Sequence, residues 1–379
     1  MCSGTQALLG RASILDFSQA SHYFQPIVRQ PALNPAEAGQ APPEDLLSSG
    51  WFFPLLLAVS LIPYVWIPLS WDWFPELGGR PMATVALLFV ASQAHVGASF
   101  FFYTDSEMRN FMLRERPWRF IGGVLGIIVA YPLVSILVDK IPAGELQLTL
   151  AFLLISFYSA WQVHHYSRQS RGILSFLSKA ESAPLSPTES RALSLTALAG
   201  ILGVLGFSYP AAEPMKLIVG ILPEISMALM AAGWLVWIAS LIRDRPQHSW
   251  RRQLAMALTL AFFFPLYFFD DIFPAFFSFA TAHGLQYFVF MWMVSRPRGE
   301  AATKAAPRIE SGGQPALRRW KPALTMVGCG LGIGGLILTL PLAFGLGIVM
   351  AHFVLDAGVW KLSEPFPRNY MAQRFPFLR

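Results

Sequence analysis

The chain has 379 residues, of which 54% are hydrophobic and only 13% are charged, whereas soluble domains average about 25% charged residues. Its mean hydropathy is +0.48, and it contains repeated apolar runs near the roughly 20 residues that a bilayer-spanning helix needs. This composition excludes a soluble globular protein and predicts a multi-pass protein of the cell membrane. The net charge of +6 does not indicate a nucleic-acid partner, because the basic residues are divided among alternate loops.

In chain order, residues 1–49 mix Pro, Gly, Ala and Ser with scattered charge, which is typical of a mostly disordered cytoplasmic extension. Residues 50–362 then form an all-α transmembrane helix bundle of about ten spans, with a linker at 296–318, followed by a cytoplasmic tail at 363–379. The spans are predicted at 50–70, 83–103, 119–138, 147–167, 191–209, 217–242, 252–269, 272–295, 322–341 and 343–362. The last two form one long apolar run, which we divide at Pro341.

The distribution of lysine and arginine sets the predicted orientation. The loops after the second, fourth and sixth spans carry several basic residues each, among them Arg109, Arg168 and Arg252, and the long loop after the eighth span is basic too. Loops after odd-numbered spans carry one basic residue at most. Because basic loops stay on the cytoplasmic side, both termini are expected to be cytoplasmic.

Histidines inside the predicted spans are the first candidates for function, since ionisable groups in a bilayer are costly. The second, fourth, eighth and tenth spans carry them, as His95, His164 with His165, His283, and His352. All four spans run towards the cytoplasm, and a rise of about 1.5 Å per residue places His95, His283 and His352 roughly 12–18 Å from the cytoplasmic ends. The histidine pair lies nearer the surface, unless its helix continues through "YSRQSRGILSFL".

Polar residues accompany these histidines at helical spacing. Asp356 follows His352 by four positions, and Gln286 and Tyr287 follow His283 by three and four, so each set shares one helix face. Imidazole is the commonest metal ligand in proteins, and carboxylates complete or orient such sites. The predicted metal ligands are His95, His164 or His165, His283, His352 and Asp356. Asp356 and Tyr287 are the predicted catalytic groups.

Two other interpretations of these residues stay open. A single intramembrane histidine can simply bond to a neighbouring helix, and the segment "WQVHHYSRQ" also fits an interfacial belt in which Trp161, Tyr166 and Arg168 meet lipid headgroups. The glycine-rich "GCGLGIGG" at 328–335 lies in a span, where the pairs Gly328 with Gly332 and Gly330 with Gly334 favour close helix packing over dinucleotide binding.

Two resemblances concern the histidines. "QVHHY" resembles one histidine box of the integral-membrane di-iron desaturases and hydroxylases, but the further boxes of that family are missing from the sequence. Single histidines on separate spans are similar to the arrangement in membrane carotene dioxygenases of the bacteriorhodopsin-related family, where scattered histidines bind iron. Membrane b-type cytochromes hold haem with a similar arrangement.

The sequence therefore favours a membrane oxidoreductase with a metal ion, iron in our first interpretation, that uses O₂ to oxidise a lipophilic substrate among membrane lipids. The basic cytoplasmic face would suit an acidic electron donor. One alternative is a haem- or pigment-binding membrane subunit. The other is a proton-coupled transporter in which the histidines form a relay.

Overall fold

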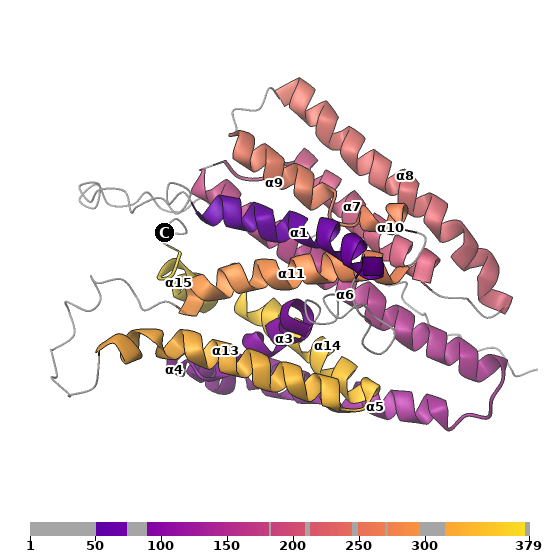
Figure 1. The fold of residues 1–379 in the computed structure, drawn as a ribbon, viewed down its shortest axis with the longest axis horizontal. Coiled ribbons are helices and arrows are strands. Elements are labelled where there is room, and N and C mark those ends of the chain that lie inside the picture. The colour runs from indigo at the N-terminus through magenta and orange to yellow at the C-terminus, as the bar shows by residue number, and fades with distance from the viewer. Residues whose placement is uncertain are drawn as a thin grey trace, which may run out of the picture. The chain divides into compact units, whose positions relative to one another are not determined.

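The computed structural model describes residues 51–73, 89–181, 183–208, 213–244, 249–269, 272–295 and 315–375. In this part of the chain it contains 13 α-helices and no β-strand, which confirms the predicted all-α fold. Residues 44–379 form one compact unit, in which the long helices lie side by side (Figure 1). The predicted extension at 1–49 and most of the predicted linker at 296–318 lie outside the described residues.

Six described segments are helical, long and apolar enough to cross a membrane, which indicates a multi-pass membrane protein. They are Trp118–Asp139, Glu145–Ala180, Pro187–Gly206, Met215–Arg243, Trp320–Thr339 and Leu342–Val359. Along the first of them, Leu125, Val129, Leu133 and Leu137 are exposed at intervals of four residues. Such an apolar stripe is suited to lipid, because water-soluble surfaces rarely expose large apolar patches.

Most predicted spans correspond to single helices. These are α1 (Phe52–Trp73), α5 (Val124–Asp139), α6 (Glu145–Ala180), α7 (Pro187–Ser208), α8 (Glu213–Asp244), α11 (Ile272–Ser295), α13 (Pro315–Thr339) and α14 (Leu342–Val359). The division at Pro341 is confirmed, since this proline is the N-cap of α14.

Two predicted spans are not continuous helices. The seventh, at 252–269, consists of α9 (Trp250–Leu260), a turn, and the short α10 (Pro265–Phe268). Pro265 offers no backbone N–H and its ring conflicts with the carbonyl four residues earlier, which favours a break here, although Pro132 in α5 and Pro223 in α8 lie inside continuous helices. The described part of the second, at 83–103, is divided into a π-helical turn, α3 (Ala94–Ser99) and a 3₁₀ turn.

Helix α6 is 36 residues long and extends well beyond the span predicted at 147–167. It runs without a break through "YSRQSRGILSFL", the continuation that the histidine pair needs to reach the depth of the others. Ser167 and Ser175 donate to backbone carbonyls four residues earlier, at 2.9 and 2.8 Å, so these polar side chains are accommodated within the helix.

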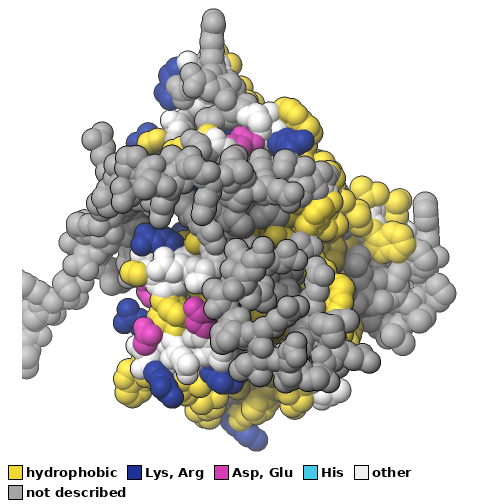
Figure 2. Space-filling model, turned by 90° about the vertical axis from the view of Figure 1, so that its left-hand side faces the viewer, with side chains coloured by type: hydrophobic (Ala, Val, Ile, Leu, Met, Phe, Trp, Pro, Cys, Tyr) yellow, Lys and Arg dark blue, Asp and Glu magenta, His cyan; other side chains and the backbone are white. Residues whose placement is uncertain are grey.

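The segments that follow the second and tenth spans meet at one end of the bundle. Arg116, after the second span, lies 3.8 Å from Glu364, after the tenth. Arg374 lies 3.4 Å from Asp105 and donates to the carbonyl of Val294, at the end of the eighth span, at 3.2 Å. Figure 2 looks onto this end and shows lysine and arginine side chains around it. The segments that follow the second and tenth spans therefore meet beside the end of the eighth span.

The C-terminal segment is part of the core. Helix α15 (Pro365–Ala372) falls within the predicted tail at 363–379, and its Tyr370 and Met371 are buried. Phe375 packs its ring 5.3 Å from that of Phe176 and 5.8 Å from that of Phe290. This segment thus closes one end of the helix bundle.

A buried ion pair joins α6, α7 and α9. The guanidinium of Arg252 donates to both carboxylate oxygens of Glu189, at 2.7 and 2.9 Å, and to the hydroxyl of Ser178 at 3.1 Å. Glu189 also accepts from the backbone N–H of Ser186, whose hydroxyl accepts from the N–H of Glu189. This reciprocal capping box begins α7 and fixes the carboxylate that Arg252 meets.

Helix α3 approaches α13 unusually closely because glycines face each other. A Cβ atom on Gly330 or Gly334 would lie about 3 Å from the backbone of Ala94, so this glycine pair does serve close packing as predicted. The other predicted pair, Gly328 and Gly332, has nothing within 4 Å of such an atom. On α3 itself, a Cβ on Gly97 would lie 2.5 Å from the carbonyl oxygen of Cys329.

Replacing Gly97 with alanine is therefore expected to push α3 away from α13 and to lower the free energy of unfolding by about 1–3 kcal/mol. Gly332→Ala is the matched control, because nothing occupies that space and alanine favours a helix. Thermal unfolding of both variants in detergent measures the difference. If the two variants were equally stable, the close approach of Gly97 to the backbone of Cys329 would be contradicted.

Candidate metal centre

Four histidines from four helices meet in the interior. His95 on α3, His165 on α6, His283 on α11 and His352 on α14 are buried, with exposed fractions of 2%, 8%, 0% and 1%. The ring centroids of successive neighbours are 4.8 Å apart from His95 to His283, 4.9 Å on to His165, 4.9 Å on to His352 and 5.1 Å back to His95. The four imidazoles thus form a closed ring, which we call the histidine ring.

The spacing of the histidine ring fits a shared metal ion. Ring nitrogens of His95, His283 and His352 all lie within 4.8 Å of one another, as do ligand atoms of His165, His352 and Asp356. Nitrogens that share one ion through bonds of about 2.1 Å lie roughly 3–4 Å apart. Each of these two groups of three, which share His352, is therefore spaced closely enough that small side-chain rotations could bring its atoms onto an ion.

Several nitrogens in the histidine ring are unsatisfied. Nε2 of His165, Nε2 of His352 and both nitrogens of His283 are buried and have no hydrogen-bond partner within the described residues. A buried polar atom without a partner costs about 1–3 kcal/mol, and native proteins keep few of them. A metal ion would pair with one nitrogen of each imidazole, the one that carries the lone pair, whereas packing alone leaves that nitrogen unpaired.

The backbone of α14 fixes which nitrogen of His352 can bind an ion. Its Nδ1 contacts the carbonyl oxygen of Val349, and a carbonyl can only accept a hydrogen bond. Nδ1 therefore carries the proton, and the lone pair is on Nε2, the atom without a partner.

Asp356 lies one turn after His352 and next to a histidine of another helix. Its Oδ2 is 3.9 Å from Nε2 of His165, and the residue is 4% exposed. Its Oδ1 accepts a hydrogen bond of 3.0 Å from the hydroxyl of Tyr287, which in turn accepts one of 2.9 Å from Ser99. The carboxylate is thus held at the edge of the histidine ring, where it can join as a ligand or orient His165.

Tyr287 contacts the site through its hydrogen bond to Asp356 and through its ring, whose centroid is 5.6 Å from that of His95. Its hydroxyl is engaged by two partners, so its position is that of a group that orients the carboxylate. Ser99, which completes this chain, was not among the predicted site residues. It follows His95 by four positions on α3, the same spacing that relates Asp356 to His352.

His164 lies outside the histidine ring. Its side chain is exposed while that of His165 is buried, because adjacent residues on a helix point about 100° apart. Of the two candidates that the sequence leaves open, the structure places His165 with the other three histidines.

An aromatic shell surrounds the histidine ring. Phe353 stacks on His165 with ring centroids 4.3 Å apart, and Tyr166 lies at the same distance from His283. Gln169 donates to the backbone carbonyl of His283 at 2.9 Å, which ties α6 to α11 beside the site. Aromatic rings therefore cover two of the four imidazoles, and a glutamine side chain ties the two helices together beside them.

The sequence matches no protein-family model, and it matches neither a curated protein nor a solved structure. Geometry alone therefore defines the class: an all-helical, multi-pass membrane protein with buried His and Asp groups that can hold a metal ion.

Proposed function

We propose that this chain is an integral-membrane enzyme whose histidine ring and Asp356 hold a non-haem iron ion for the O₂-dependent oxidation of a lipophilic substrate. The observation that carries the proposal is the closed ring of four buried imidazoles, in which His165, His283 and His352 have nitrogens without hydrogen-bond partners among the described residues. Imidazole and carboxylate ligands with open coordination positions are typical of non-haem iron oxygenases.

The geometry favours a bare ion over haem. Each imidazole is in edge contact with two others, at centroid spacings of 4.8 to 5.1 Å. This leaves no gap between neighbours for a flat macrocycle. A proton relay is also disfavoured, because both nitrogens of His283 lack hydrogen-bond partners among the described residues, and a relay needs a continuous line of such bonds.

The chain's own groups would prepare the site for this chemistry. An iron ion bound there would supply the activation of O₂. Tyr287 would keep Asp356 in one orientation, and Phe353 and Tyr166 would exclude water from the ligands. The apolar surroundings and the membrane spans fit a substrate that partitions into lipid, and the basic end of the bundle would suit an acidic electron donor.

Elemental analysis and a visible spectrum of the detergent-purified protein test the proposal. We expect stoichiometric iron without a Soret band, together with O₂ consumption when lipid extracts are supplied. A Soret band would support the haem-binding alternative. A protein that stays metal-free after anaerobic incubation with ferrous iron would overturn the proposal.

A further inference from the structure

Three cations surround one carboxylate where the segments after the second and tenth spans meet. Nζ of Lys361 lies 2.8 Å from a carboxylate oxygen of Glu364, and guanidinium nitrogens of Arg116 and Arg119 lie 3.8 and 4.0 Å from that carboxylate. We call these four residues the basic cluster. The hydrogen bond from Lys361 and the nearby arginines lower the pKa of Glu364, so its negative charge is present at neutral pH. One carboxylate does not neutralise three cations, and the cluster keeps an excess of positive charge.

The basic cluster is open to its surroundings. The side chain of Arg116 is 57% exposed, and those of Lys361 and Arg119 are partly exposed. Arg119 is also held in place against α14, because a Cβ atom on Gly358 would lie 2.9 Å from its Nε. A second anion that approaches from outside therefore meets cations that are already gathered.

The basic cluster lies at the ends of two membrane-long helical segments. Arg119 is the second residue of the segment Trp118–Asp139, and Lys361 comes two residues after α14 ends at Val359. Charged residues at the end of an apolar span lie at the level of the lipid headgroups. The cluster is thus placed where a lipid phosphate lies.

Trp118 is next to the basic cluster and is exposed as well. Its exposed fraction of 88% is the largest of any large apolar side chain in the described residues. Its ring lies along the following helical turn, since a Cβ atom on Gly122 would be 3.3 Å from its Cε3. Gly122 precedes Leu125, the first residue of the exposed apolar stripe of α5, by three positions. The indole therefore begins this stripe at the end where positive charge gathers.

These features match one class of ligand. An exposed indole beside arginines is typical of the membrane interface, and basic residues there attract the anionic lipids of the cytoplasmic leaflet. A soluble acidic partner would leave the apolar stripe without a contact, and a zwitterionic lipid brings no net charge to offset that of the cluster. We propose that the basic cluster and Trp118 bind an anionic phospholipid, with its phosphate at the three cations and an acyl chain along α5.

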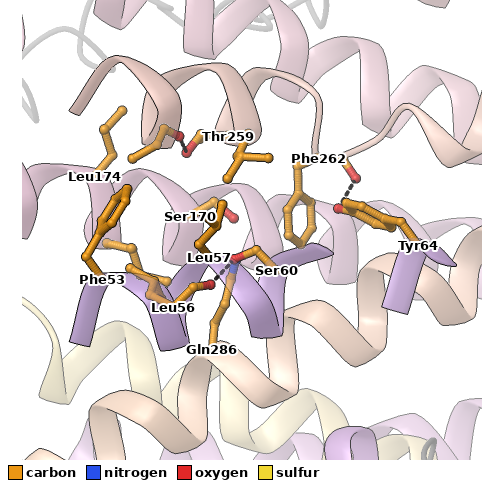
Figure 3. A pocket seen from close by; sticks show the side chains of 13 residues that line it. Phe53, Leu56, Leu57, Ser60, Tyr64, Ser170, Leu174, Thr259, Phe262 and Gln286 are labelled. Carbon is orange, nitrogen blue, oxygen red and sulfur yellow. Dashed lines mark hydrogen bonds between the residues drawn. The ribbon is translucent and has the colours of Figure 1, made fainter. Parts of the chain in front are cut away.

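The outer surface of α5 has room for such a chain. From Leu125 to Leu137 the stripe extends about 18 Å along the helix axis, which exceeds half of the roughly 30 Å hydrocarbon thickness of a bilayer. By contrast, the pocket between α1, α6, α9 and α11 has only about 30 Å³ of space for water-sized groups, enough for a few water molecules. Figure 3 shows how closely side chains surround that pocket, with Gln286 bonded to Ser60.

Native mass spectrometry of the purified full-length protein tests the proposal. The protein in detergent is titrated with phosphatidylglycerol, which is anionic, or with phosphatidylcholine of the same chains, which is zwitterionic, and the bound lipid molecules are counted. We expect tighter binding of phosphatidylglycerol. Arg116→Ala and Lys361→Ala should each weaken its binding about fivefold and leave that of phosphatidylcholine unchanged. Trp118→Ala should weaken the binding of both lipids.

Lys140→Ala is the matched control, because this exposed lysine follows the other end of α5. Arg116→Lys keeps the charge and should retain binding. Equal affinity for the two lipids, or equal losses in Arg116→Ala and Lys140→Ala, would overturn the proposal. Displacement of phosphatidylglycerol by inorganic phosphate would also overturn it, since the cluster would then take a free anion. None of these outcomes depends on the metal centre, so the two proposals are tested separately.

Discussion

Replacing His165 with alanine is expected to lower metal affinity by more than about 100-fold, whereas replacing His164 leaves it unchanged. The first substitution removes one imidazole of the histidine ring, and outer groups that only orient ligands already contribute about 10- to 100-fold. The second removes an exposed side chain on the same helix. Metal content of the purified variants, measured by elemental analysis after equal exposure to a chelator, gives the comparison.

The neighbouring histidines make this pair of variants a stringent control. Both change the same residue type at consecutive positions of α6, so effects on expression or detergent extraction should be similar. Equal metal loss in both variants, or full retention in both, would count against the histidine ring as the metal site.

Replacing Glu189 with leucine is expected to lower the free energy of unfolding by about 3–5 kcal/mol, because it leaves the buried guanidinium of Arg252 unpaired. The double variant Glu189→Leu with Arg252→Met should recover most of this loss, since hydrophobic replacement of a whole buried pair is often neutral. Equilibrium unfolding in mixed micelles measures both.

Glu189→Gln separates the two roles of this residue. Glutamine still serves the capping box with Ser186 but removes the negative charge that Arg252 meets. A variant as stable as the wild type would show that capping, and not the ion pair, joins α7 to its neighbours. Intermediate stability is the expected result.

Much of the candidate site follows from local sequence rules. The similar depth of His95, His283 and His352 along their spans follows from the rise per residue of a helix, once the spans and their direction are set. The position of Asp356 beside His352 follows from the four residues that separate them on one helix. The choice between His164 and His165 does not follow from such rules, because the two are adjacent and only packing decides which side of α6 faces inwards.

Other features depend on contacts distant in sequence. Arg252 counts as a loop charge in the topology prediction, yet it is buried against Glu189, 63 positions away. Only the tertiary structure brings these two together. Proline alone did not locate the break of the seventh span: Pro265 lies at that break, but Pro132 and Pro223 lie inside continuous helices. Helix α6 has no proline between its two ends.

The order of the ligands along the chain has a consequence for biosynthesis. His352 is on α14, the last of the four helices to leave the ribosome, and the core around it also needs Phe375. Chains are synthesised from the N-terminus, and their earlier parts fold first. The three earlier histidines are therefore synthesised before the set is complete, so the proposed ion can bind to the full set of ligands only after the last helix has inserted.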